Sequence, residues 1–160
     1  MAQGKTNAMR ILDAKKVKYE LMTYDNKDGK IDGVSVAQKI NKDPKAVFKT
    51  LVAHGTSTQL FVFIIPVEEE LDLKKAAKAA GEKKIEMIPV KDIQKYTGYI
   101  RGGCSPIGMK KQYPSFIAAQ ASELEGIIVS GGKIGVQIEI ATEDLIQVIQ
   151  AKLEDVCKYL

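Results

Sequence analysis

The middle of the chain reads VFKTLVAHGTSTQLFVFII over residues 47–65, and this stretch decides how the remaining sequence is interpreted. β-Branched and aromatic residues dominate 48–53 and 59–65, a composition typical of strands. The polar residues 55–58 between them predict a turn. We therefore expect an antiparallel hairpin whose two strands are central in a sheet.

Turn signals recur on both sides of this hairpin and divide the chain into short elements. Apolar periodicity predicts helices at 6–14, 35–40, 68–80, 89–97 and 142–149, with one extra turn after Asp43-Pro44, and strands at 17–22, 84–88, 116–119, 126–130 and 134–140. In the first strand, alternation places Leu21 on the buried side. Because strands cluster and are joined by short turns, we expect an α+β fold with a mixed, largely antiparallel sheet and helices packed outside it.

Several helix ends carry recognisable signals. Ser35 followed by Gln38 matches a capping box for the second helix. The helix at 68–80 has acidic residues at its start and Gly81 after its last turn, an order that suits the helix dipole. Thr142 is expected to cap the last helix.

Length and composition indicate one domain of ordinary size over residues 1–160. The longest apolar run, 60–67, contains Pro66 and is far shorter than the roughly 20 residues of a membrane-spanning helix. The first residues have no apolar stretch of signal-peptide length. We expect a cytoplasmic protein that does not bind membranes.

Residues with obvious chemistry are sparse. The two cysteines lie 53 residues apart, the single histidine is His54, and no metal-ligand spacing, P-loop, dinucleotide-binding or hydrolase motif occurs. We expect reduced thiols, no metal and no cofactor. His54 is interpreted as a strand-end residue, and a Cys104–His54 nucleophilic pair remains an alternative.

Charge is distributed unevenly. Residues 74–111 hold ten basic and three acidic side chains, a net charge of +7, whereas the whole chain carries +4. If the fold gathers these lysines on one face, they form a surface for a polyanion. The alternative is that they only keep the protein solvated.

Lys49 is the most informative single residue, because it interrupts an apolar strand. A lysine between apolar neighbours must extend to solvent, pair with an acid, or face a cleft. A second cue is the loop GYIRGGCSPIG at 98–108, whose glycines bring backbone amides close to a ligand. Such amides can stabilise the oxyanion of a reacting ester.

Taken together and in order, five motifs resemble the YbaK/EbsC family, whose best-known members are bacterial Cys-tRNA(Pro) deacylases. The motifs are VFKTL (47–51), LKKAA (73–77), TGY (97–99), GGCSPIG (102–108) followed by two lysines, and VSGGK (129–133). The likeness runs from about residue 5 to residue 155. It implies a curved, barrel-like sheet and a freestanding editing enzyme similar to the domain inserted in bacterial prolyl-tRNA synthetases.

The resemblance also implies the site. It makes Lys49, Gly102 and Pro106 the catalytic residues, with Gly102 and Pro106 shaping the wall that holds the aminoacyl ester. The positions implied for substrate binding are Tyr24, Thr50, Gly103, Ser105, Ser130 and Gly131. The implied partner is aminoacylated tRNA(Pro); docking on prolyl-tRNA synthetase is left open, and the basic stretch is expected to meet acceptor-end phosphates.

An aminoacyl ester is already activated, so positioning and oxyanion stabilisation can suffice for its hydrolysis. The hypothesis is that the cysteine thiol of the substrate attacks its own ester; attack by a bound water is the competing route. Deacylation of Ala-tRNA or Ser-tRNA, and a non-catalytic module that binds RNA or protein, stay open as alternatives.

Overall fold

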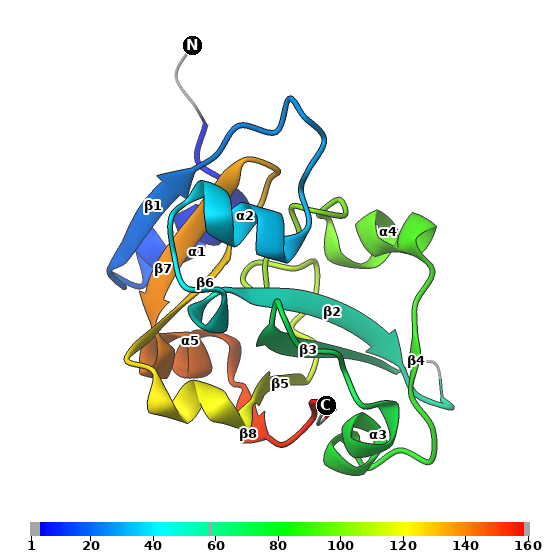
Figure 1. The fold of residues 1–160 in the computed structure, drawn as a ribbon. Coiled ribbons are helices and arrows are strands. Elements are labelled where there is room, and N and C mark those ends of the chain that lie inside the picture. The colour runs from blue at the N-terminus through cyan, green and yellow to red at the C-terminus, as the bar shows by residue number, and fades with distance from the viewer. Residues whose placement is uncertain (1–3, 58, 159–160) are drawn as a thin grey trace.

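Two β-sheets form the frame of the computed structural model, which describes residues 4–57 and 59–158 (Figure 1). The three-stranded sheet has the order β1-β7-β6, and the five-stranded sheet has the order β4-β2-β3-β5-β8. Their strands are β1 (Tyr19–Thr23), β2 (Phe48–His54), β3 (Leu60–Pro66), β4 (Glu86–Met87), β5 (Ser115–Ala118), β6 (Gly126–Ser130), β7 (Val136–Ala141) and β8 (Lys152–Glu154). Only β3–β5 and β5–β8 pair in parallel among the named strands, so the predicted mixed, largely antiparallel arrangement is confirmed.

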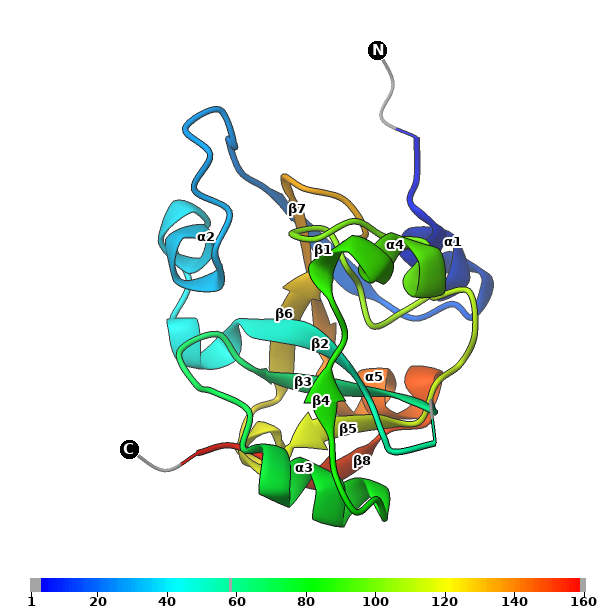
Figure 2. The ribbon, with the colours of Figure 1, turned by 90° about the vertical axis from the view of Figure 1, so that its right-hand side faces the viewer.

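Helices lie around the outside of the two sheets, as Figure 2 shows from the side. They are α1 (Asn7–Ala14), α2 (Gly33–Lys39), α3 (Leu73–Ala80), α4 (Ile93–Thr97) and α5 (Thr142–Ile149), with 3₁₀ turns η1 (Pro44–Ala46), η2 (Val90–Asp92) and η3 (Ala119–Glu123). The predicted α+β class is therefore confirmed. No helix in the described ranges is both long and apolar enough to cross a bilayer.

The predicted hairpin is present and central. β2 and β3 pair from Phe48 opposite Pro66 to His54 opposite Leu60. Every residue of β3 is buried, because β3 lies between β2 and β5 and is covered on both faces. Phe63 stacks on its β5 neighbour Phe116 with ring centroids 5.4 Å apart.

The two sheets meet at the start of β2. Val47 forms an isolated parallel bridge with Ile128 of β6, and the Val67 amide donates to the Val47 carbonyl at 2.9 Å. The resemblance implies a curved, barrel-like sheet, and the structure has two sheets that are joined at one corner by this bridge. Residues 47–50 therefore lie where both sheets, α2 and the glycine loop can reach them.

Three predicted helix starts differ from the structure, two because another side chain caps the first amides and one because the predicted cap bonds elsewhere. Asp32, not Ser35, caps α2, and its carboxylate accepts from the Ser35 amide at 3.1 Å. Asp72 caps α3, so that helix begins at Leu73 and not at residue 68. Thr142 is the first residue of α5 and does not cap it, since its hydroxyl donates to the Leu124 carbonyl at 2.8 Å.

Strand β1 also departs from the prediction. It pairs only with β7 among the named strands and forms the edge of its sheet. Leu21, predicted to be buried, is 54% exposed. Alternation correctly predicted the strand, but an edge strand has too little cover to bury one whole face.

Candidate active site

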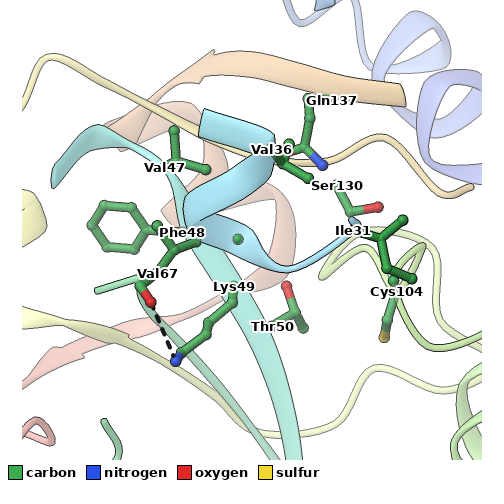
Figure 3. A pocket seen from close by; sticks show the side chains of 12 residues that line it. Ile31, Val36, Val47, Phe48, Lys49, Thr50, Val67, Cys104, Ser130 and Gln137 are labelled. Carbon is green, nitrogen blue, oxygen red and sulfur yellow. Dashed lines mark hydrogen bonds between the residues drawn. The ribbon is translucent and has the colours of Figure 1, made fainter. Parts of the chain in front are cut away.

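A pocket of about 120 Å³ lies at the corner where the two sheets meet (Figure 3). Its walls come from the start of β2, the adjoining ends of β6 and β7, the first turn of α2, and the glycine loop. The lining residues are Ile31, Gly33, Val36, Val47, Phe48, Lys49, Thr50, Val67, Gly102, Cys104, Ser130 and Gln137. Segments up to 106 residues apart in sequence therefore build one small site.

Lys49 lines this pocket. Of the three environments that the sequence allows, namely solvent, an acidic partner or a cleft, the structure therefore selects the cleft. Its Nζ donates to the Val67 carbonyl at 3.5 Å, the long limit of a hydrogen bond. None of the carboxylates in residues 4–57 and 59–158 lies within 4.0 Å of it. Partial burial lowers the pKa of Lys49, and the charge of Glu70 opposes that shift. The ammonium is thus partly desolvated and available to an anionic or polar ligand.

Thr50 adds a second unsatisfied group to the same wall. Its hydroxyl is buried and has no hydrogen-bond partner in the described part of the chain. A buried hydroxyl without a partner costs about 1–3 kcal/mol. A ligand that hydrogen-bonds to Thr50 Oγ1 would recover part of that free energy.

The glycine loop approaches the pocket with its backbone. Gly102 has φ of +86°, and a Cβ there would lie 2.8 Å from Ile31 Cδ1. Gly102 and Cys104 both line the cavity, and in the described ranges neither of their amides donates to a protein acceptor. Such amides can bind an oxyanion.

The buried Tyr99 holds the glycine loop in place through a hydrogen bond. Tyr99 donates its hydroxyl to the Ile107 carbonyl at 2.7 Å, and burial raises the pKa of Tyr99 to about 12. The phenol therefore stays protonated at neutral pH and keeps donating. Gly103 packs against backbone, since a Cβ there would lie 2.8 Å from Lys133 Cα.

The opposite wall depends on α2. A Cβ at Gly33 would overlap the side chain of Val67, so glycine lets the helix approach the pocket. Lys39 anchors the preceding loop by donating to the carbonyls of Asp25 and Lys30 at 2.7 and 2.9 Å and to the Asp28 carboxylate at 2.7 Å. This anchoring holds the segment that carries Ile31 to the pocket.

The structure brings together four of the nine site residues named from the sequence: Lys49, Thr50, Gly102 and Ser130 line the pocket. The other five do not line the pocket; they are Tyr24, Gly103, Ser105, Pro106 and Gly131.

Gly103, Ser105, Pro106 and Gly131 belong to the loops behind the walls. Ser105 Oγ accepts from the Ile107 amide at 3.2 Å, and the adjoining Pro106 is buried. The Gly131 carbonyl accepts from the Thr6 hydroxyl at 2.5 Å. Tyr24 has its own buried, unpartnered hydroxyl, and Lys39 Nζ lies 5.8 Å from its ring centroid.

The alternative nucleophilic pair is not assembled. Burial raises the pKa of the Cys104 thiol to about 11, so it is protonated at neutral pH. His54 lies at the far end of β2, where its ring contacts Gly55 and Glu86. It lies four positions along the strand from Thr50, a span of about 13 Å.

Sequence reasoning missed Gln137 and the apolar wall. Gln137 is buried in β7 and lies directly opposite Ser130 in the β6–β7 register. A glutamine on the same strand face as Glu139, opposite the apolar face of Val136, Ile138 and Ile140, is the only sequence signal for it, and it is a weak one. Across residues 4–57 and 59–158, no three side chains of the metal-binding types gather into a potential ion site.

Comparison with known proteins agrees with this geometry. Residues 32–148 match the aminoacyl-tRNA editing domain, and these residues include all but one of the residues that line the pocket. The chain belongs to the aminoacyl-tRNA editing domain family. This membership confirms the resemblance drawn from the sequence.

Individual members of the editing domain family are also similar. The chain is 46% identical over 154 residues to EbsC of Enterococcus faecalis, a candidate Cys-tRNA(Pro)/Cys-tRNA(Cys) deacylase, covering 96% of this chain and 94% of that protein. A candidate trans-editing enzyme for prolyl-tRNA synthetase superimposes with a TM-score of 0.81 at 18% identity, over 98% of this chain and 100% of the other. Hypothetical protein APE2540 gives 0.86 at 16% identity, over 95% and 99%. The last two likenesses show the shared fold.

Proposed function

We propose that this editing domain is a trans-editing hydrolase that removes cysteine from mischarged Cys-tRNA(Pro) by cleaving the aminoacyl ester. The observation that carries the proposal is the pocket itself, where the ammonium of Lys49 and the hydroxyl of Thr50 lack strong protein partners beside the amides of Gly102 and Cys104. The similarity to EbsC supports the choice of substrate.

Size supports a small aminoacyl group as the ligand. An engineered protein cavity of about 150 Å³ takes up benzene, so a pocket of about 120 Å³ suits a side chain the size of cysteine but not a nucleobase. Ile31, Val36 and Val67 give the pocket apolar walls for such a side chain. The nucleotide would remain at the mouth.

In this proposal each lining group has a role. Lys49 holds the terminal ribose or phosphate oxygens, while Thr50 and Ser130 orient the amino acid. The amides of Gly102 and Cys104 stabilise the oxyanion, and one such donor is typically worth about 2.7–4 kcal/mol. Gly103, Ser105, Pro106, Gly131 and Tyr24 hold the walls in place.

The attacking group comes from the substrate. The cysteine thiolate adds to its own ester carbonyl, and the C–O bond to the ribose then breaks. The ribose oxygen takes up a proton from solvent, which balances the proton that the thiol lost on forming the thiolate, and a cyclic thioester remains. Water opens the thioester and releases cysteine. Neither Cys104, which is protonated, nor the distant His54 is needed as a base.

A panel of aminoacyl-tRNAs tests the proposal. Purified protein is incubated with Cys-, Ala-, Ser- and Pro-tRNA(Pro) and with Cys-tRNA(Cys), with and without prolyl-tRNA synthetase. We expect Cys-tRNA(Pro) to be hydrolysed fastest. Faster hydrolysis of Ala-tRNA or Ser-tRNA would reassign the substrate, and no hydrolysis of any ester would leave a binding module. A change in the rate of hydrolysis on adding prolyl-tRNA synthetase would reveal docking.

The proposed function also implies a location. A trans-editing enzyme must act in the compartment where tRNA is charged, so we propose that the protein is cytoplasmic.

A further inference from the structure

We propose that a second, lysine-lined depression between α4 and the end of the β2–β3 hairpin binds the phosphate backbone of the tRNA acceptor arm. This inference rests on the proposed function and names the part of the substrate that lies outside the catalytic pocket. We call the depression the α4 groove. It is lined by Ser57, Gln59, Leu60, Lys95, Tyr96, Lys110, Lys111, Gln112 and Tyr113.

The α4 groove is larger than the catalytic pocket and is built by tertiary contacts. Its volume is about 590 Å³. Tyr113 donates its hydroxyl to the Tyr96 carbonyl at 2.8 Å, and Lys110 Nζ donates to the Lys95 carbonyl at 3.1 Å. These bonds hold residues 110–113 against α4, so the backbone that carries Lys110 and Lys111 has a fixed position in the groove.

The three lysines of the α4 groove are free of carboxylate partners. Lys95, Lys110 and Lys111 are exposed, and no acid of residues 4–57 and 59–158 lies within 4.0 Å of their ammonium groups. Lys75 and Lys84 of the same basic stretch instead pair with Asp155 and Glu86 at 3.1 and 2.8 Å. The fold therefore concentrates only part of the basic stretch into an anion-binding surface.

Aromatic rings favour RNA over an acidic protein as the ligand. Tyr96 and Tyr113 are half-buried and contribute to the lining, and Lys95 Nζ lies 5.1 Å from the Tyr96 ring centroid. Lysines interleaved with tyrosines are typical of surfaces that bind a phosphate backbone and stack on exposed bases. An acidic peptide would use the charges but not the rings.

The α4 groove and the catalytic pocket share one loop. Residues 98–108 carry Gly102 and Cys104 to the pocket, and both ends of this loop reach the groove, where the Lys110 amide donates to the Thr97 carbonyl at 3.1 Å. In Figure 2, α4 and the hairpin end lie on the side opposite α2. An RNA chain can thus follow the loop from one site to the other.

The separation suits a tRNA end. Leu60 in the groove pairs with His54, five residues along β2 from Lys49, which corresponds to about 17 Å. At roughly 3.4 Å per stacked nucleotide, this distance spans about five nucleotides. With the ester in the pocket, the groove would meet phosphates where the unpaired 3′ end joins the acceptor stem.

The test compares two triple variants with the same change in net charge. K95A/K110A/K111A removes the groove cations, and K18A/K78A/K152A removes three exposed lysines that lie outside both sites. We measure binding of uncharged tRNA(Pro) between 50 and 200 mM salt, and deacylation of both Cys-tRNA(Pro) and the cysteinyl ester of a CCA trinucleotide.

We expect the groove variant to bind tRNA about 10- to 100-fold more weakly at low salt, with a log–log salt slope shallower by roughly 2–3. Its turnover of the trinucleotide ester should equal that of the wild type, and the control variant should stay within about twofold of wild type throughout. Equal losses in the two variants, or a loss on the trinucleotide ester, would overturn the proposal.

Two further readouts keep the test decisive. K95A/K111A retains the Lys110 hydrogen bond, so it replaces the triple variant if the latter does not fold, and it should show about two thirds of the slope change. If wild-type protein hydrolyses no ester, the proposed function fails, and tRNA binding still decides whether the α4 groove is an RNA site.

Discussion

Lys49 and Val67 meet where the two sheets join: the lysine ammonium donates to the valine carbonyl at 3.5 Å, while the valine amide donates to Val47 at 2.9 Å. Val67 thus forms hydrogen bonds both to the residue at the corner of the fold and to the ammonium of Lys49. Because its acceptor is a neutral carbonyl at long distance, Lys49 keeps most of its capacity to bind an anion. A carboxylate in the same place would have neutralised it.

Lys49→Ala should abolish deacylation and leave the fold intact. The side chain is half-buried and forms one long hydrogen bond, so we expect the free energy of unfolding to change by less than about 1 kcal/mol. Lys49→Arg should also fail, because a planar fork cannot replace a compact ammonium. Single-turnover hydrolysis and urea unfolding measure the two effects. Wild-type turnover by folded Lys49→Ala would refute the assignment.

The pH dependence of stability should reveal the burial of Lys49. Burial lowers the pKa of Lys49 in the folded state, so the unfolded chain binds more protons between the lowered pKa and 10.5. In that window the wild type should gain stability with rising pH relative to Lys49→Met, whose other charges are the same. Urea unfolding of both proteins from pH 7 to pH 10.5 measures the difference. If the free energy of unfolding of the wild type, relative to that of Lys49→Met, stayed constant or fell with rising pH, the expected direction would be contradicted.

Gly102→Ala should lose activity and stability together. Its φ of +86° costs a non-glycine residue about 1–2 kcal/mol, and the added Cβ meets Ile31 at 2.8 Å. Gly81→Ala is the matched control, because Gly81 has φ of +71° at the end of α3 and an added methyl group there would meet no atom within 4 Å. We expect Gly81→Ala to lose stability alone. Equal activity in the two variants would show that the Gly102 wall is not needed.

Catalysis should survive loss of Cys104, of His54 and of metal. Burial raises the pKa of Cys104 to about 11, so at pH 7–8 the thiol is a poor nucleophile and should react slowly with iodoacetamide. Cys104→Ala, His54→Ala and chelator treatment should each leave substantial deacylation. Complete loss in Cys104→Ala, with no recovery by another small residue, would favour the nucleophilic pair.

Blocking the thiol of the substrate should stop its hydrolysis. Intramolecular attack needs a free sulfur, whereas a bound water would cleave any ester that fits the pocket. Cys-tRNA(Pro) is compared with the same tRNA carrying S-methylcysteine or serine at equal concentration and salt. We expect rapid loss of cysteine and persistence of the other two esters. Fast hydrolysis of the S-methyl ester would identify water as the nucleophile.

Much of the frame follows from local sequence. The hairpin at 48–66 was predictable because its apolar, β-branched runs are separated by a polar turn, and both strands are buried enough to follow that pattern. Gly81 ends α3 as predicted, since the left-handed conformation there favours glycine. Helix starts were less predictable, because several nearby polar side chains compete to cap the same amides, as Asp32 and Ser35 do.

For the site, the sequence by itself determined which residues are candidates for chemistry: an isolated lysine in an apolar strand and a loop whose glycines leave backbone amides accessible to a ligand. Only the tertiary structure decided which of them share a cavity. Lys49, Gly102 and Ser130 converge because β2 joins both sheets at Val47, and Gln137 reaches them through its pairing with Ser130. These contacts connect distant segments, and local periodicity carries no information about which distant segments pack together.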